Sequence, residues 1–209
     1  MILTKVEILD LMNTDIADPK SLYISPILSE DQIGDDTINI RLGTYFLIFQ
    51  NTSIECVRLS DLDIKHIADY QAIVHIPLGE EIIIPPNTLI LGISLEYIKM
   101  PNCVYGEVGT RSSWGRLGLV IATAINIHQN FRGCLTLELV NHGNIPLALS
   151  PGIEIGQLVL HKLTREINTE YKFTGKYTGC VKPEFTRIYE EQTIIKRLRE
   201  ISRTYHSQF

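Results

Sequence analysis

Apolar and polar positions follow a strand-like pattern through the centre of this chain and a helical pattern only at its two ends. Residues 4–13 begin with a T-x-x-E capping box at Thr4 and Glu7 and continue with an apolar side, which predicts a short helix. The apolar runs that follow are short and are bounded by Gly, Pro or Asn: "DDTINIRLGTYFLIF", "EEIIIPPNTLILGISLEYI", "GLVIATAINI", "GCLTLELVN", "IPLALSPG" and "IGQLVLHKL". The first run predicts a pair of strands, and the series as a whole is typical of an all-β sandwich or barrel.

The end of the chain is first polar and then helical. The last apolar run ends near Leu163, and the polar residues 164–187, with two glycines and a proline, predict a mobile arm. The run "EEQTIIKRLREI" predicts an amphipathic helix whose acidic residues come first and whose basic residues come later, as the helix dipole favours. We therefore expect one domain over residues 1–188, with a closing arm over 164–188, and a C-terminal helical extension over 189–209.

The charge of the chain limits its partners. The 209 residues carry a net charge of −5 at pH 7, and 44% of them are apolar, which is enough for a substantial core. The acidic balance argues against a nucleic-acid-binding protein, whose affinity depends on a basic surface. It does not exclude a small anionic ligand, because a local cluster of arginines can outweigh a weak global field.

The cysteines and the N-terminus indicate the compartment. The four cysteines lie far apart without a C-x-x-C pair, so the spacing of a zinc site and the signature of the zinc deaminases are both absent. We expect reduced thiols, as in cytoplasmic proteins. The N-terminus lacks the features of a signal peptide, and no apolar run approaches the roughly 18 residues of a membrane span. A cytoplasmic protein that binds no membrane is therefore expected.

Glu138 is the most unusual polar residue, because it interrupts the apolar run "CLTLELVN". Period-two alternation places it on one face with Cys134, Thr136 and Val140, and three leucines on the other face. One interpretation is an outer face that meets water, as charged strand residues usually do. The other is a partly buried general base, whose pKa is raised by burial and lowered by a nearby arginine. The local pattern leaves both interpretations open.

A second group of polar residues is the stretch "GTRSSWGRLGL", residues 109–119. Its arginines offer planar donor forks that suit phosphate or a polarised carbonyl, and its serines add hydroxyl groups. Gly109, Gly115 and Gly118 allow the backbone to approach a ligand closely. The alternative is a solvated turn before the strand at Leu119. The stretch matches neither a Walker A motif nor a dinucleotide-binding fingerprint.

The arm contains a third candidate, "EYKFTGKYTG" at residues 170–179. Lys176 and two tyrosines beside glycines form a segment that can close over a phosphate. An ordinary polar tail is the alternative interpretation of this segment taken alone.

Together these segments resemble the dCTP deaminase family of the trimeric dUTPase-like superfamily, and the resemblance spans residues 1–188. "GTRSSWGRLGL" is similar to the family's G-R-S-S-x-x-R-x-G-L, and "ATAINIHQNFRGCLTLELVNHGNIPLAL" is similar to A-T-A-x-x-I-D-x-x-F-x-G-x-x-T-L-E-L-x-N. "SPGIEIGQLVLHKL" resembles P-G-x-x-I-G-Q-L, "DDTINIRLG" resembles S-Y-D-L-R-L-G, and "GKYTG" resembles the closing arm. The order and spacing of these motifs make the resemblance specific.

The resemblance implies an all-β, distorted jelly-roll-like barrel of the dUTPase-like or β-clip type, to which the pattern adds the short N-terminal helix and the C-terminal helix. It implies a homotrimer with active sites at the subunit interfaces. It also implies hydrolysis of the 4-amino group of dCTP to dUTP and ammonia without zinc. Mg²⁺ accompanies the triphosphate through its phosphates, and some members of the family also remove pyrophosphate from dUTP.

Carried over position by position, the resemblance makes Glu138 the general base, which takes a proton from the water that attacks C4 of cytosine. Ser112 and Arg116 match the pair that orients this water and the carboxylate. The remaining matches are substrate contacts: Arg111 and Ser113 at the phosphates, Thr123 and Ala124 at the pyrimidine edge, Thr136 on the Glu138 face, His128 at the deoxyribose, and Tyr171, Lys176 and Cys180 in the arm.

Two positions depart from the family pattern. His128 replaces an aspartate that contacts the deoxyribose and that positions the hydrolytic water in dUTPases, so it counts against a diphosphatase, although an exposed turn residue without a role is the alternative. Cys180 replaces a glutamine and weakens the expected cap over the triphosphate. We therefore expect deamination of a deoxycytidine nucleotide. The alternatives are a dUTP diphosphatase, a bifunctional deaminase–diphosphatase, and a trimeric nucleotide-binding protein without turnover.

Overall fold

The structure is a computed structural model that describes residues 1–50, 53, 55–58, 67–122, 126–166, 177 and 179–206. The chain divides into two units, each described here by itself. The first unit comprises residues 1–48 and 73–183, and the second comprises residues 49–72 and 184–209. All of the described residues of the expected functional site belong to the first unit, and the expected helical extension belongs to the second.

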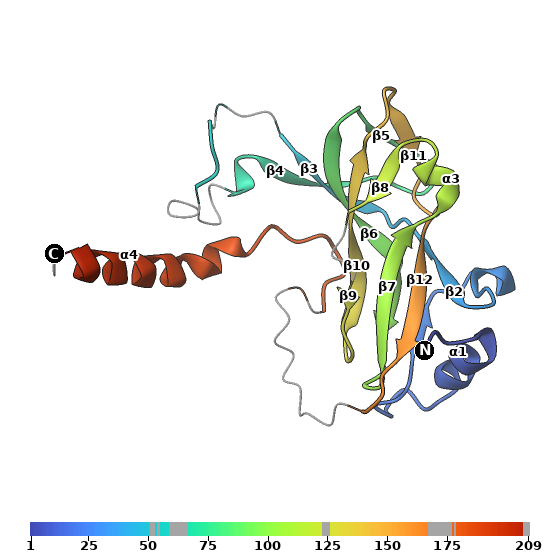
Figure 1. The fold of residues 1–209 in the computed structure, drawn as a ribbon. Coiled ribbons are helices and arrows are strands. Elements are labelled where there is room, and N and C mark those ends of the chain that lie inside the picture. Colours follow the sequence, from blue (N-terminus) through green and yellow to red (C-terminus); the bar gives the residue numbers. More distant parts are fainter. Residues whose placement is uncertain are drawn as a thin grey trace. The chain divides into compact units, whose positions relative to one another are not determined.

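The strands form three sheets, which Figure 1 draws as arrows. Among the described residues, the largest sheet has the order β4-β3-β6-β10-β8, with β1 also paired to β6; the second has the order β2-β12-β7-β9, and the third pairs β11 with β5. The strands are β1 (Tyr23–Ser25), β2 (Thr37–Arg41), β3 (Tyr45–Phe49), β4 (Gln71–His75), β5 (Ile82–Ile84), β6 (Thr88–Lys99), β7 (Val104–Thr110), β8 (Leu119–Ile121), β9 (Asn126–Ile127), β10 (Arg132–Asn141), β11 (Leu147–Leu149) and β12 (Glu154–Lys162).

The prediction of a mostly β chain is confirmed, since each apolar run contains the expected strands. The predicted pairing within the first run is wrong, because β2 and β3 lie in different sheets. The link between them is fixed against β6 at Gly43, whose N–H donates to the Ile93 carbonyl oxygen at 2.7 Å. A Cβ on Gly43 would meet that oxygen at 2.9 Å. The chain therefore passes from one sheet to the other at Gly43 instead of turning back as a hairpin.

Alternation along β10 determines which of its side chains enter the core. Leu135, Leu137 and Leu139 are buried and join a core of leucine and isoleucine side chains from both larger sheets. Burial of each such side chain contributes about 1.5–3 kcal/mol. Successive strand residues point to opposite faces, so these leucines fix β10 with the half-buried Glu138 on the face away from the core.

The N-terminal helix is confirmed as α1 (Lys5–Met12), with its capping box in place. The Glu7 carboxylate accepts hydrogen bonds from the backbone N–H and from the hydroxyl of Thr4, each at 2.9 Å. Ile8 anchors the helix because its side chain is fully buried in the core. The backbone of the preceding residues continues beside β12, where the Lys162 N–H donates to the Met1 carbonyl oxygen at 2.9 Å.

The second unit contains the C-terminal helix, which is confirmed as η2 (Ile188–Glu191) followed by α4 (Gln192–His206). Glu190 and Glu191 lie in its first turn, as the pattern predicts. Its apolar residues Ile194, Leu198 and Ile201 are exposed. None of the helices in the described residues is long and apolar enough to cross a membrane.

One carboxylate of the first unit, that of Glu96, is fully buried between β6 and β2. It accepts hydrogen bonds from Gln32 Nε2 at 2.8 Å and from the Arg41 backbone N–H at 3.0 Å. Burial outweighs these hydrogen bonds and raises the pKa of Glu96 to about 7. Because this pKa lies above that of an exposed glutamate, Glu96 stabilises the fold at low pH, and this contribution is lost as the pH rises through 7.

Glu96→Gln is expected to remove this pH dependence. Between pH 5 and pH 8 the free energy of unfolding of the wild type should fall by about 2 kcal/mol relative to that of the variant, because only the wild-type side chain must ionise inside the fold. Urea unfolding at several pH values measures the difference, with the exposed Glu80→Gln as the matched control. A gap between wild type and Glu96→Gln that stays constant from pH 5 to pH 8 would contradict the raised pKa.

Candidate active site

Glu138 lies on β10, between β6 and β8 in the largest sheet. Its cross-strand neighbour on β6 is Leu91. On the other side, the N–H of Ala122 donates to the Glu138 carbonyl oxygen at 2.8 Å. Ala122 directly precedes two of the predicted pyrimidine contacts, Thr123 and Ala124. The backbone pairing therefore places Ala122 beside Glu138.

The environment of the Glu138 carboxylate is partly desolvated. The side chain is half-buried, which leaves both interpretations of this strand face open. Burial raises the pKa of Glu138. A higher pKa makes the ionised carboxylate a stronger base, and general bases are most effective when their pKa lies near the working pH.

The stretch rich in arginine and serine forms α3 (Ser112–Gly115), a single helical turn between β7 and β8. The two residues that precede it are tied to strands β12 and β8. The Arg111 N–H donates to the Ile155 carbonyl oxygen on β12 at 3.1 Å. The Thr110 hydroxyl oxygen accepts the Ile121 N–H on β8 at 2.7 Å. This anchoring presents the side chains of Ser112, Ser113 and Arg116 to solvent, where all three are exposed.

The three glycines of this stretch differ in what they do. A Cβ on Gly109 or Gly115 would meet no atom within 4 Å, so both leave open space beside the turn, as close approach of a ligand requires. Gly118 has φ +91°, and a Cβ there would lie 2.5 Å from the Gly143 nitrogen. Gly118 is therefore required by the fold itself, at the point where the turn enters β8.

Arg111 is held by a carboxylate that the sequence did not single out. Its guanidinium forms an ion pair with Glu154, the first residue of β12. The same carboxylate binds Arg41 Nη2 at 2.9 Å and Asn39 Nδ2 at 3.1 Å. Trp114 Nε1 donates to the Glu154 carbonyl oxygen at 3.0 Å. The Glu154 carboxylate thus lies between two guanidinium groups.

An open hollow of about 420 Å³ adjoins the turn and is lined by Arg111, Ser113, Trp114, Leu117, Ile153 and Glu154. It brings together the two predicted phosphate contacts, Arg111 and Ser113. Ser112 and Arg116 lie on the same turn. The side chains of both residues are exposed.

The other predicted contacts are distributed more widely. His128 is exposed between β9 and β10, and Thr136 is half-buried on the Glu138 face. Cys180 is buried, and its carbonyl oxygen accepts the Cys134 N–H at 2.8 Å, so this part of the arm is bound to the start of β10. Thr123, Ala124, Tyr171 and Lys176 lie outside the described residues, and their roles stay predictions.

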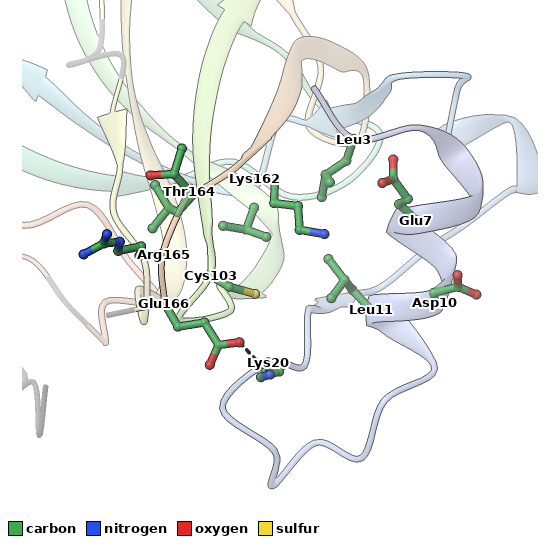
Figure 2. A pocket seen from close by; sticks show the side chains of 12 residues that line it. Leu3, Glu7, Asp10, Leu11, Lys20, Cys103, Lys162, Thr164, Arg165 and Glu166 are labelled. Carbon is green, nitrogen blue, oxygen red and sulfur yellow. Dashed lines mark ion pairs between the residues drawn. The ribbon is translucent and has the colours of Figure 1, made fainter. Parts of the chain in front are cut away.

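A second cavity, of about 410 Å³, lies beside α1 at the far end of β12 (Figure 2). Lys20 Nζ and Glu166 Oε1 form an ion pair of 2.6 Å at its edge. Figure 2 shows the Lys162 ammonium group between Leu3 and Leu11, which contribute apolar surface. None of the described site residues lines this cavity. It is therefore separate from the hollow at α3.

The donor groups of the chain do not form a protein metal site in the part that the structure describes, since no three His, Cys, Asp or Glu side chains gather there. Mg²⁺ commonly binds through substrate phosphates with few protein ligands.

Sequence reasoning missed Glu154, Arg41 and Trp114. Glu154 lies in the matched segment "SPGIEIGQLVLHKL". Its partner Arg111 is 43 positions earlier, in the connection between β7 and β8. The only available signal was a lone acidic residue at the start of an apolar strand, which is a common surface pattern. The single tryptophan within the arginine-rich turn was a visible oddity, but its hydrogen bond to β12 was not.

Comparisons with known proteins give a consistent result. A family model described as dCTP deaminase-like matches residues 2–163. A dCTP deaminase from Halorubrum lacusprofundi is 34% identical over 192 residues, which is 90% of this chain and 91% of that protein. A protein from Coprothermobacter proteolyticus named dCTP deaminase, dUMP-forming, is 37% identical over 171 residues, 81% of this chain and 89% of the other.

A solved structure shows the same fold. The crystal structure of 2'-deoxycytidine 5'-triphosphate deaminase from Agrobacterium tumefaciens matches with a TM-score of 0.57 at 18% identity. The match covers 77% of this chain and 48% of that chain, so this chain spans about half the length of that protein. The likeness confirms the arrangement of strands that the motifs predict.

Proposed function

The chain belongs to the dCTP deaminase-like family, and we propose that it hydrolyses the 4-amino group of a deoxycytidine nucleotide, most directly dCTP, to give the deoxyuridine nucleotide and ammonia. The observation that carries this proposal is the position of Glu138. It is a half-buried carboxylate on the central part of a sheet, beside Ala122, and burial raises its pKa.

The reaction needs one group that moves protons. Glu138 takes a proton from a water molecule as the water oxygen attacks C4 of cytosine, and it delivers this proton to N3. It then takes the proton of the new C4 hydroxyl and passes it to the departing amine. The C4–N4 bond then breaks, ammonia leaves, and the C4 oxygen becomes the carbonyl of uracil. Ser112 and Arg116 orient the water and the carboxylate. Zinc is not required in this scheme, because the carboxylate and its donors activate the water.

The phosphates bind at α3 in this proposal. Arg111 and Ser113 already line one hollow, and the space beside Gly109 and Gly115 is open. Arginine donors suit phosphate oxygens because their forks are planar and permanently charged. Mg²⁺ accompanies the nucleotide through its phosphate oxygens, and Lys176 with Tyr171 on the arm completes the enclosure.

A homotrimer with sites between subunits is part of the proposal. Ser112 and Arg116 are exposed, at the start and at the C-cap of α3. The turn of one copy can approach Glu138 of the next, which makes the active unit inseparable from assembly. Leu117 and Val120, beside the turn, are exposed apolar residues suited to such a contact. Light scattering should give a mass near three times the 23.7 kDa chain, and an active monomer would contradict this arrangement.

A second candidate activity is loss of pyrophosphate after deamination. Relatives from Coprothermobacter proteolyticus and Methanobrevibacter smithii, 37% and 36% identical, are named dUMP-forming. His128 stands against this activity, because an imidazole differs in charge and reach from the aspartate expected there.

One assay separates the candidates. Purified protein is incubated with dCTP or with dUTP in the presence of Mg²⁺, and ammonia and pyrophosphate are measured separately. Ammonia alone from dCTP is the expected result. Ammonia and pyrophosphate in equal amounts would identify the dUMP-forming activity, and pyrophosphate from dUTP without ammonia from dCTP would identify a diphosphatase. Nucleotide binding with neither product would overturn the proposed function.

A further inference from the structure

We propose that Glu154 is a positioning residue for nucleotide binding: its carboxylate fixes the orientation of Arg111 and docks α3 onto β12. This inference rests on the proposed function only in assigning the phosphates to Arg111. Glu154 lies within the segment that matches P-G-x-x-I-G-Q-L, at a position where the pattern accepts any residue. The motifs that suggested the function therefore assign no role to it.

Three contacts join the turn to the same short stretch of β12. The Arg111 side chain is paired with the Glu154 carboxylate, and the Arg111 N–H donates to the Ile155 carbonyl oxygen at 3.1 Å. The Trp114 indole N–H donates to the Glu154 carbonyl oxygen at 3.0 Å. Arg111 and Trp114 are thus both bonded to the start of β12, at Glu154 or Ile155. The turn cannot move relative to β12 without breaking several of these bonds.

The Glu154 carboxylate is itself held in place. Its Oε1 atom accepts a hydrogen bond from Arg41 Nη2, and its Oε2 atom accepts one from Asn39 Nδ2. Arg41 is only 14% exposed, and its backbone N–H is bound to the buried Glu96. The chain of contacts therefore runs from the interior at Glu96 through Arg41 and Glu154 to Arg111. Arg111 is thus held by groups that are themselves hydrogen-bonded to the interior.

An arginine placed in this way loses less side-chain entropy on binding a phosphate. One of its nitrogens is occupied by Glu154, and the side chain remains 33% exposed in the hollow at α3. Its remaining donors are available for an anion that enters there. Arg111 therefore contributes permanently charged donors to the hollow for the phosphates.

Positioning and simple charge neutralisation predict opposite results for Glu154→Gln. If Glu154 only weakened the field of Arg111, its removal would tighten nucleotide binding. If it positions Arg111, its removal weakens binding. We expect the Kd for dCTP to rise about tenfold, which is the scale of one charge-assisted hydrogen bond. The kcat should change by less than about threefold, since Glu154 does not touch the reacting atoms.

Affinity is measured by calorimetry with dCTP and Mg²⁺ in a Glu138→Gln background, in which turnover is blocked, so the result does not depend on deaminase activity. If the wild-type protein released no ammonia from dCTP, the proposed function would be overturned. The binding test would still be valid, because it measures affinity alone. Glu107→Gln removes a half-exposed carboxylate from the neighbouring strand β7 and is the matched control, with affinity expected to stay unchanged. Unchanged or tighter binding by Glu154→Gln would overturn the inference.

A second variant separates charge from position. Glu154→Asp keeps the charge but shortens the reach to Arg111, so a role in charge alone predicts wild-type affinity. Positioning predicts an affinity between those of the wild type and Glu154→Gln. The emission of Trp114, the only tryptophan in the chain, reports directly on the docking of the turn. It should shift to longer wavelength in Glu154→Gln while the melting temperature stays near that of the wild type; unchanged emission would contradict the docking role.

Discussion

Glu138→Gln is expected to lower the rate of ammonia release from dCTP by about 10²–10⁴-fold, the range that a general base contributes. The variant side chain has nearly the same shape but cannot accept a proton from water. Burial raises the pKa of the wild-type carboxyl, so the substitution also removes the partial cost of keeping a charge there, and the fold should be at least as stable as before. Nucleotide affinity should stay within about threefold of the wild type, because no phosphate contact is lost.

The measurement combines a coupled ammonia assay with calorimetric titration of dCTP. Glu107→Gln again serves as the matched control, since it removes one carboxylate from another strand of the same unit and should keep full activity. Turnover that persists in Glu138→Gln would remove Glu138 from the role of base. Loss of turnover together with loss of binding would instead assign Glu138 to substrate recognition.

Gly118→Ala is expected to destabilise the first unit by about 3–5 kcal/mol. The residue has φ +91°, and a Cβ would lie 2.5 Å from the nitrogen and 2.8 Å from the Cα of Gly143. Both neighbours are backbone atoms, so neither can rotate away. The contact is held in place because the His142 N–H donates to the Gly118 carbonyl oxygen at 2.8 Å. The substitution must therefore move α3 or the loop after β10, and nucleotide binding should fall with stability.

Gly79→Ala is the matched control for this change. Gly79 has φ +90°, but a Cβ there would meet no atom within 4 Å. It isolates the conformational cost of a left-handed residue, about 1–2 kcal/mol. Urea unfolding of both variants measures the difference, which represents the steric term at Gly118. Equal destabilisation by the two substitutions would show that the close approach to Gly143 is not a constraint.

The strands were predictable because a short apolar run bounded by Gly, Pro or Asn indicates a strand without reference to distant residues. The run "EEIIIPPNTLILGISLEYI" divides at its prolines into β5 and β6, as the pattern indicates. The capping box at Thr4 gives the start of α1 for the same reason, since all of its interactions lie within four residues. Local patterns of this kind are decided by neighbouring residues and do not depend on the rest of the fold.

Pairing between distant segments was not predictable. The exchange between sheets at Gly43 depends on the Ile93 carbonyl oxygen, 50 positions away, and the burial of Glu96 depends on β2. The ion pair of Arg111 with Glu154 likewise joins two segments that the chain order keeps apart. Period two could place Glu138 on a face of β10, but only the packing of β6 and β8 around it decides how far that face is buried.

The glycines of the arginine-rich turn show how one residue type serves two purposes. The pattern treats Gly109, Gly115 and Gly118 alike, as positions where the backbone approaches a ligand. The structure separates them, because only Gly118 has a left-handed conformation and a backbone neighbour where a Cβ would stand. Nothing in the local sequence distinguishes a glycine required by the fold from one that leaves space for a ligand.

The central claim is that one partly buried carboxylate activates water without a metal bound by the protein. The most direct measurement is the rate of ammonia release from dCTP by protein that has been treated with a zinc chelator and supplied with excess Mg²⁺. We predict the same rate as for untreated protein. A loss of activity that added Zn²⁺ restores would contradict the claim.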